Sequence, residues 1–338
     1  MGLKNIVRSA IVFSIILLTS TVYATPSGSI IAWGNDDSGQ CNVPVPNSGF
    51  TAIATGYLHS LGLKSDGSIV GWGRNTFGDC NTPLPNSGFT AIAAGSSHSL
   101  GLRSNGSIAA WGDNGYGLCS VPEPNSGFVA IAAGWEHSLG LKANGSIVAW
   151  GYNDFGQCNV PEPNSGFVAV AAGKGHSLGL KSDGSIVVWG GTGDSVPEPN
   201  SGFTAIAAGS SHYLGLKADG SIVAWGRNSE GQCNIPEPNS GFTAIAAGGW
   251  NNLGLKADGS IVAWGWNYYG QRDVPEPNTG FVAIATGGHS LAIRECLYNV
   301  AGDLNDDCKV DMLDFAVTAN NWLLDCYATP SNPACIPK

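Results

Sequence analysis

The most regular feature of the chain is a pattern of apolar and polar positions that recurs about every 39 residues. Each copy contains a short alternating run, F-x-A-[IV]-A, which is typical of a half-buried strand. Two further runs, H-S-L-G-L-K and G-S-I-V-A-W-G, flank an Asp-Gly or Asn-Gly dipeptide. Such a dipeptide between alternating runs is a strong hairpin signal. The pattern therefore predicts three strands in each copy, two of them joined by a tight turn.

Two aromatic markers set the number and the length of the copies. A phenylalanine follows P-N-[ST]-G seven times. Within each copy, the segment around G-Q-C-N is expected to add a short fourth strand. Four strands in about 40 residues indicate a propeller blade, so we expect an all-β, seven-bladed β-propeller of four-stranded blades. The tryptophans of G-S-I-x-x-W-G are separated by 39 residues, except for one interval of 36, and are Trp33, Trp72, Trp111, Trp150, Trp189, Trp225 and Trp264.

The two ends of the repeat region are complementary. The region begins at residues 28–34 with the second half of a copy and ends at residues 281–294 with the first half. Pairing of these halves would close the ring in one blade and leave no long free edge strand.

The net charge indicates the class of partner, and the first residues indicate the compartment. The chain carries a net charge of −10, which disfavours DNA or RNA as a partner. Lys4 and Arg8 precede a short apolar run, and Val22-Tyr23-Ala24 resembles a cleavage site. Residues 1–24 are therefore interpreted as a signal peptide, and residues 25–295 as the propeller. We expect a secreted or cell-surface protein, without a membrane span and monomeric.

Residues that recur in every copy are interpreted as scaffold. Asn251 takes the place of the repeated histidine in the sixth copy, and asparagine is a poor transition-metal ligand, so the histidines are expected to be structural. The repeated tryptophans are expected in the core, the connector glutamates in solvent, and the repeated cysteines free and buried. These histidines and cysteines are His59, His98, His137, His176, His212 and His289, and Cys41, Cys80, Cys119, Cys158 and Cys233.

Positions that differ between copies are the candidates for a specific function. They occur in the turn G-x-x-H and in the loop after W-G-x-N, and many are aromatic, as is typical of binding surfaces. No unrepeated cluster of nucleophiles, histidines or carboxylates accompanies them, so we expect a binding protein and not an enzyme. The predicted face for a protein or glycan comprises Tyr57, Phe77, Tyr116, Trp135, Glu136, Phe155, Trp250, Trp266, Tyr268 and Tyr269.

Residues 296–338 form a separate tail with a candidate calcium loop. A D-x-[DN]-x-[DN] motif is followed by a predicted amphipathic helix with Phe315 and Trp322 on one face. The oxygens fall at the spacing of EF-hand ligands, with a backbone carbonyl at position seven, so we predict Ca²⁺ as a cofactor. An Asp-rich surface turn is the alternative. The predicted ligands are Asp303, Asn305, Asp307, Lys309, Asp311 and Asp314.

The tail resembles a dockerin repeat, a calcium-loop module that docks onto cohesin domains. The resemblance covers residues 302–324, with Cys308 where glycine is usual and one loop where dockerins carry two. It implies a cohesin-like partner. Four cysteines in an exported tail also predict two disulfides, with three pairings open, among Cys296, Cys308, Cys326 and Cys335.

The propeller repeat resembles that of the regulator of chromosome condensation family. The run I-A-A-G-S-S-H-S-L-G-L at residues 92–102 follows the signature of that family, with similar copies around the other repeated histidines. The resemblance covers residues 28–295 and implies a seven-bladed propeller. It also implies nucleotide exchange on a nuclear GTPase, or, by analogy with secreted bacterial members, inhibition of β-lactamases through one face.

These observations lead to one main expectation and two alternatives. The chain is expected to be a secreted, non-enzymatic binding scaffold, with a ligand on one propeller face and a calcium-dependent tail for docking or surface attachment. One alternative is an accessory subunit or weak hydrolase of an extracellular polysaccharide-degrading complex. The other is guanine-nucleotide exchange.

Overall fold

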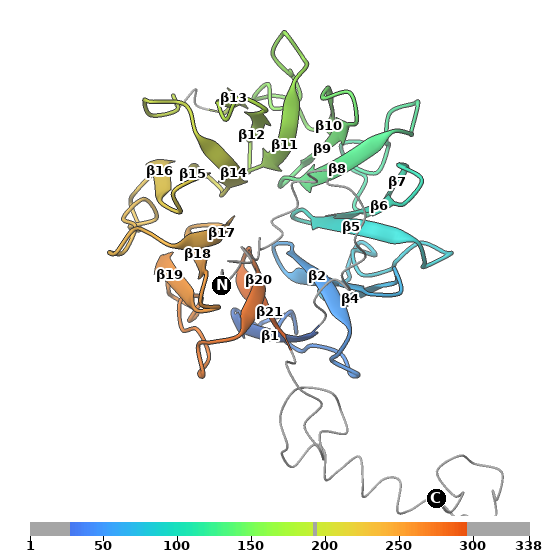
Figure 1. The fold of residues 1–338 in the computed structure, drawn as a ribbon. Coiled ribbons are helices and arrows are strands. Elements are labelled where there is room, and N and C mark those ends of the chain that lie inside the picture. Colours follow the sequence, from blue (N-terminus) through green and yellow to red (C-terminus); the bar gives the residue numbers. More distant parts are fainter. Residues whose placement is uncertain (1–27, 192–194, 296–338) are drawn as a thin grey trace, which may run out of the picture.

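The fold is a ring of small antiparallel sheets. It is taken from a computed structural model that describes residues 28–191 and 195–295. The described residues form 21 strands and no helix, so the all-β prediction is confirmed. The strands form groups of three, each with an inner, a middle and an outer strand. The inner strands surround the centre of the ring (Figure 1).

We number the triplets as units 1 to 7 in the order of their inner strands. Unit 7 combines the last two strands of the described residues with the first. The bounds of the units are as follows: unit 1, β2 (Phe50–Thr55), β3 (His59–Lys64) and β4 (Ile69–Gly73); unit 2, β5 (Phe89–Ala94), β6 (His98–Arg103) and β7 (Ile108–Gly112); unit 3, β8 (Phe128–Ala133), β9 (His137–Lys142) and β10 (Ile147–Gly151); unit 4, β11 (Phe167–Ala172), β12 (His176–Lys181) and β13 (Ile186–Gly190); unit 5, β14 (Phe203–Ala208), β15 (His212–Lys217) and β16 (Ile222–Gly226); unit 6, β17 (Phe242–Ala247), β18 (Asn251–Lys256) and β19 (Ile261–Gly265); unit 7, β20 (Phe281–Thr286), β21 (His289–Glu295) and β1 (Gly28–Gly34).

The two ends of the repeat region meet in unit 7. Strand β1 pairs antiparallel with β21 along seven residues, from Gly28 opposite Glu295 to Gly34 opposite His289. A single further pair, Gly28 with Phe50, links units 7 and 1 into one six-stranded sheet. The predicted closure by terminal strands is therefore confirmed, and Figure 1 shows β1 beside β20 and β21.

The predicted fourth strand of each blade is wrong for the described residues. The segment around G-x-C-N forms consecutive turns instead. In unit 1 the Asn75 side-chain oxygen accepts a hydrogen bond from the Cys80 N–H (2.9 Å), and the Asn81 N–H donates to the Gly78 carbonyl (2.9 Å). Because these polar groups are used locally, the segment cannot extend the sheet ladder.

The core lies between neighbouring units. Leu100, Leu102 and Ile108 of unit 2 pack against Phe128 and Trp150 of unit 3, and the same arrangement recurs around the ring. All seven repeated tryptophans are buried, with exposed fractions of 3–7%, as predicted from their repetition. The scaffold is thus held together by contacts from one unit to the next.

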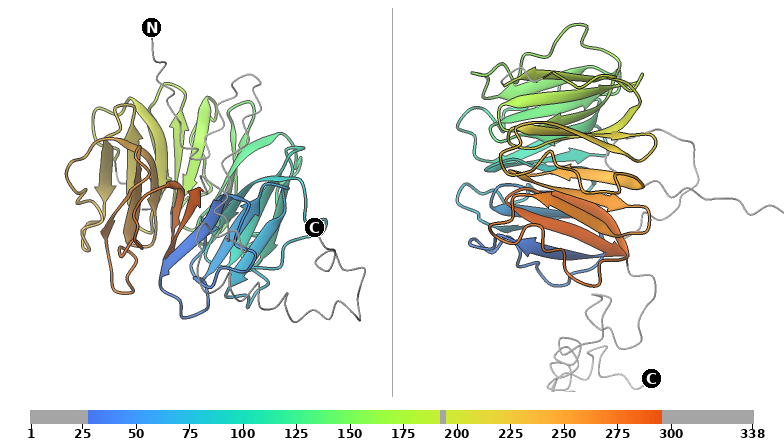
Figure 2. Two further views of the ribbon diagram at one scale, coloured as in Figure 1. Left: turned by 60° about the horizontal axis from the view of Figure 1, so that its bottom comes forward. Right: turned by 90° about the vertical axis from the view of Figure 1, so that its left-hand side faces the viewer.

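Glycines allow neighbouring units to approach each other closely around the centre of the ring. The first residue of each G-x-x-H turn lies against the carbonyl group of the equivalent glycine in the next unit. A Cβ added to Gly134 would lie 2.5 Å from the Gly173 oxygen and 2.4 Å from His137 Cε1. Only glycine fits this close approach of two backbones. The strands run between two faces of the resulting disc, which Figure 2 shows from the side.

Candidate binding face

The two variable segments of each repeat lie on the same face of the disc. In unit 1, His59 pairs with Gly73, so the turn before β3 is adjacent to the loop after β4. The Arg74 N–H donates to the Leu58 carbonyl (2.8 Å), and the corresponding bond occurs in units 2, 3, 5 and 6. We call this surface the variable face. It brings together the two sets of residues that the sequence singled out.

The opposite face carries the uniform parts of the repeat. In each hairpin turn an aspartate or asparagine side chain accepts bonds from the serine two residues later, as Asp66 does from Ser68 (2.8 and 2.6 Å). These hydrogen bonds lower the pKa of Asp66 below its ordinary value. The face is therefore built from the same turn chemistry in each hairpin, and we call it the hairpin face.

A cationic clamp on the hairpin face was missed by sequence reasoning. In unit 3 the Lys142 ammonium lies 4.0 Å from the centre of the Phe128 ring and donates to the Pro124 (2.8 Å) and Ser126 (2.6 Å) carbonyls. Equivalent lysines or arginines lie over the first phenylalanine in the other units. The signal was present in the sequence as the repeated basic residue of H-S-L-G-L-K.

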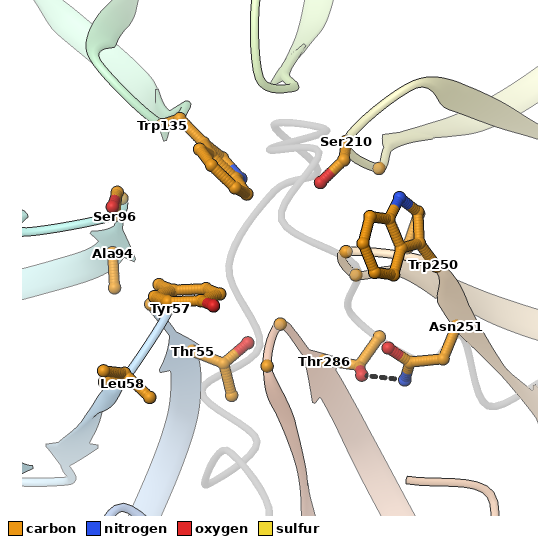
Figure 3. Close-up of a pocket in the computed structure, with 18 of the residues that line it drawn as sticks. Thr55, Tyr57, Leu58, Ala94, Ser96, Trp135, Ser210, Trp250, Asn251 and Thr286 are labelled. Atoms are coloured by element: carbon orange, nitrogen blue, oxygen red, sulfur yellow. Dashed lines mark hydrogen bonds between the residues drawn. The ribbon is translucent and has the colours of Figure 1, made fainter. Parts of the chain in front are cut away.

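A cavity of about 360 Å³ opens at the centre of the variable face. Its walls are the G-x-x-H turns of all seven units, in which the glycines and the strand-terminal alanines leave room for larger side chains to project. Five predicted residues line it, namely Tyr57, Trp135, Trp250, Trp266 and Tyr269. Figure 3 shows Tyr57 and Trp135 on one side of this cavity and Trp250 across from them.

The aromatic residues form two groups at the cavity. On one side the rings of Tyr57 and Trp135 lie 5.6 Å apart, and the Lys174 ammonium is 4.4 Å from the Trp135 ring. On the other side the Trp250 and Trp266 rings are 5.3 Å apart and nearly perpendicular. These contacts hold the rings in defined orientations, which lowers the entropy lost when a ligand is bound.

The remaining predicted face residues lie outside the cavity. Tyr268 is 77% exposed and stacks on Trp266, continuing the second aromatic group toward solvent. Phe77 is exposed and separate from both groups. The other three, Tyr116, Glu136 and Phe155, belong to a neighbouring part of the face between units 2 and 4.

Polar residues at the cavity were missed at the sequence level. Thr55 and Thr286 end the inner strands of units 1 and 7, where the other units have alanine. Thr286 accepts a hydrogen bond from the Asn251 amide (2.5 Å), as Figure 3 shows. The signal was again a position that differs between copies, in a strand interpreted only as scaffold.

The repeated histidines form a buried belt that links the units. His59 Nε2 lies 2.9 Å from Ser99 Oγ of the next unit, and His98 lies 3.0 Å from Ser138. Ser99 Oγ donates its own proton to the Asp79 carbonyl (2.9 Å), so it accepts from the imidazole N–H. All of these side chains are fully buried, so the pairs cannot act on a substrate. The predicted structural role is supported.

Burial keeps the belt uncharged. It lowers the pKa of His59, His137 and His289 to about 3 and that of His98 to about 4. The charged form is disfavoured because the imidazoles have left water. No group of three or more metal-ligating side chains occurs among the described residues.

The five repeated cysteines are free, as predicted, but they are only half-buried. Each thiol lies against a backbone carbonyl, as Cys80 Sγ does at 3.3 Å from the Arg74 oxygen. Partial burial raises the pKa of Cys41 to about 12 and that of Cys80, Cys119 and Cys158 to about 11. Such thiols remain protonated and are poor nucleophiles.

The scaffold around this face matches a known repeat family. The family model for the regulator of chromosome condensation (RCC1) repeat matches more than half of the chain, at residues 50–79, 89–118, 128–157, 167–194, 203–232 and 242–271. The chain belongs to the RCC1 repeat family. Six repeats match the family model, whereas the sequence pattern predicts seven copies. The remaining unit is the one assembled from both ends of the repeat region.

Several solved structures have a similar fold. Prp20p from Saccharomyces cerevisiae has 18% sequence identity and a TM-score of 0.68, over 89% of this chain and 95% of that one. Human WBSCR16 has 18% identity and a TM-score of 0.63, over 79% and 99%. The CRINKLY WD40 ectodomain of the Arabidopsis thaliana receptor kinase ACR4 has 27% identity and a TM-score of 0.57, over 70% and 88%. No curated protein matches the sequence.

Several predictions lie outside the described residues. They are the signal peptide at residues 1–24, the calcium ligands from Asp303 to Asp314 and the disulfide candidates from Cys296 to Cys335. Within residues 28–191 and 195–295, no helix is long and apolar enough to cross a membrane.

Proposed function

We propose that this chain is a secreted, non-enzymatic binding protein that holds a protein partner at the cavity of its variable face. The observation that carries the proposal is the placement of Tyr57, Trp135, Trp250 and Trp266 around one cavity on an otherwise uniform ring. Large aromatic side chains in defined orientations are the residues that dominate binding energy at protein interfaces.

The charges beside the aromatic groups of the cavity favour a protein over a glycan. Lys174 lies over Trp135 and Arg227 lies 5.8 Å from the Trp250 ring, while Glu136 and Glu230 are close in sequence to these pairs. A mixture of aromatic and charged groups of both signs complements a protein surface and gives it orientation. Among the relatives of the fold, Prp20p is described with binding properties toward Gsp1p and histones.

The proposal is tested by affinity capture from the culture medium of the native host. The Trp135→Ala/Trp250→Ala variant should lose the proteins that the unchanged chain retains, because it removes one ring from each aromatic group. Leu84→Ala removes an exposed apolar side chain from a connector and should retain them. A glycan in place of a protein, or equal capture by both variants, would contradict the proposal.

We further propose that the tail binds Ca²⁺ through Asp303, Asn305, Asp307, the Lys309 carbonyl, Asp311 and Asp314, and attaches the protein to a cohesin-like or surface partner. The spacing of five side-chain oxygens supports this proposal. Calcium should slow proteolysis within residues 296–338 of the full chain, and a chelator should reverse the effect. The Asp303→Ala/Asp307→Ala variant should show no calcium effect, and protection that is independent of calcium would contradict the assignment.

A further inference from the structure

A second aromatic surface lies on the variable face, away from the central cavity. The ring of Tyr116, in the loop after β7, lies 4.9 Å from that of Tyr152, in the loop after β10. The Phe155 ring lies 5.9 Å from Tyr152 in an edge-on arrangement. Tyr116 and Phe155 are 54% and 59% exposed. None of the three residues lines the cavity.

This surface joins three neighbouring units, which fixes the positions of its rings. The Tyr152 N–H donates to the Glu136 carbonyl (2.8 Å), which anchors the loop to the inner turn of unit 3. The Phe155 ring rests on Gly175 in the inner turn of unit 4, where an added Cβ would lie 3.1 Å from the ring. The arrangement is therefore set by the contacts between units and not by the loops alone.

Two carboxylates, Asp113 and Asp154, are close to these rings in sequence, and a third, Glu136, acts on Tyr152. Asp113 accepts a hydrogen bond from the Gly115 N–H (2.8 Å), next to Tyr116. Hydrogen bonding to Asp154 is the main cause that raises the pKa of the Tyr152 hydroxyl, and the charge of Glu136 acts in the same direction. We call Tyr116, Tyr152, Phe155, Asp113, Glu136 and Asp154 the Tyr116 patch.

The Tyr116 patch lacks the cation that accompanies other aromatic groups of this molecule. The first phenylalanine of every unit has a lysine or arginine over its ring, and so do Trp135 and Trp250. In the part of the chain that the structure describes, no such residue lies over the three rings of the patch. The nearest candidate in unit 4, Lys174, is placed on Trp135.

We propose that the Tyr116 patch binds an arginine side chain of the protein partner. Electron-rich ring faces attract a cation, and the carboxylates of the patch add charge complementarity. Arginine fits better than lysine because its planar guanidinium can stack on a ring while it donates hydrogen bonds to a carboxylate. The inference rests on the proposed protein-binding function and adds a second contact point beside the cavity.

The test uses the full chain and three short peptides, acetyl-Gly-X-Gly-amide with arginine, lysine or citrulline at X. Tyrosine ring resonances of ¹³C-tyrosine-labelled protein report binding, and a Tyr116→Phe variant assigns the signal of Tyr116. We expect saturable shifts at Tyr116 and Tyr152 with the arginine peptide, weaker binding of the lysine peptide and no binding of citrulline, which is the uncharged analogue of arginine.

Variants separate this site from the general acidity of the protein. Tyr116→Ala/Phe155→Ala keeps all carboxylates and should weaken arginine binding, followed at Tyr152, by about tenfold, as expected for the loss of two cation–aromatic contacts. Asp154→Asn should weaken it by about threefold. Trp250→Ala removes a cavity ring other than the one that holds Lys174 and should leave arginine binding at the patch unchanged, so a failure of the patch can be distinguished from a failure of the cavity. Equal binding of citrulline, undiminished binding to the Tyr116/Phe155 variant, or no saturable shift would overturn the proposal.

Discussion

The histidine belt makes the stability of the ring depend steeply on pH. Four of its imidazoles have a pKa near 3 or 4 in the folded protein, compared with about 6.5 in an unfolded chain. The unfolded state therefore binds protons more readily than the folded state. The stabilisation that results is complete above pH ~6.5 and is lost as the pH falls toward the folded pKa values.

The expected magnitude follows from the number of protons involved. Near pH 5 each of the four histidines binds about one more proton unfolded than folded, which corresponds to about 1.4 kcal/mol per pH unit per histidine. Together they should remove about 5 kcal/mol per pH unit. Domains are stable by about 5–15 kcal/mol, so the ring should unfold near pH 5. The raised pKa of Asp79 opposes this trend, but it is a single group.

The assay is urea unfolding followed by tryptophan fluorescence at several pH values between 7 and 4.5. A His98→Asn variant serves as the comparison, because asparagine does not titrate and Asn251 already occupies the equivalent position in unit 6. The variant should show a pH slope that is smaller by about 1.4 kcal/mol per pH unit. A free energy of unfolding that is constant from pH 7 to 5, or an identical slope in the variant, would refute the reasoning.

Three further predictions concern the scaffold. Gly134→Ala should destabilise the ring by about 2–3 kcal/mol in urea unfolding, because the added Cβ would overlap the Gly173 oxygen and His137. The control Gly249→Ala should be nearly neutral, because its added Cβ would lie no closer than 3.9 Å to any atom outside the two adjacent residues. Lys142→Ala should cost about 1 kcal/mol in the same assay through loss of the clamp on Phe128, and an unchanged midpoint would contradict this. Cys41, Cys80, Cys119 and Cys158 should react slowly with a disulfide reagent at pH 8 in the folded protein and rapidly in urea, as mass spectrometry of the labelled peptides would show. Rapid labelling of these four thiols in the folded protein would disprove their raised pKa values.

Much of the fold could be predicted because each strand and turn signal recurs in every repeat. Each Asp-Gly or Asn-Gly turn and each tryptophan gives the same information, so an error in one copy is corrected by the others. The fourth strand was a wrong prediction because local bonds, such as those of Asn75, compete with the ladder and are not visible in an apolar pattern. The basic residue over Phe128 was missed because a repeated lysine beside a turn resembles a solvated one.

The sequence indicated several residues of the candidate site, but not which of them lie together. Variation between copies correctly indicated Trp135 and Trp250, because a residue that a scaffold does not need is free to differ. Which aromatics share the cavity depends on inter-unit geometry, so Tyr57 contacts Trp135 although a whole unit separates them in sequence. Tyr152 was missed because its position is polar in most other copies, as at Asn35 and Arg74, although Trp266 at the same position was identified.

Binding of a partner on the variable face can be measured on the protein itself. The most direct test is hydrogen–deuterium exchange of the full chain, measured alone and in complex with the captured partner. We expect slower exchange in the inner turns at residues 55–58, 133–136 and 247–250, with no change in the hairpin turns at 65–68, 143–146 and 257–260. Protection of the hairpin turns, with the inner turns unchanged, would contradict it.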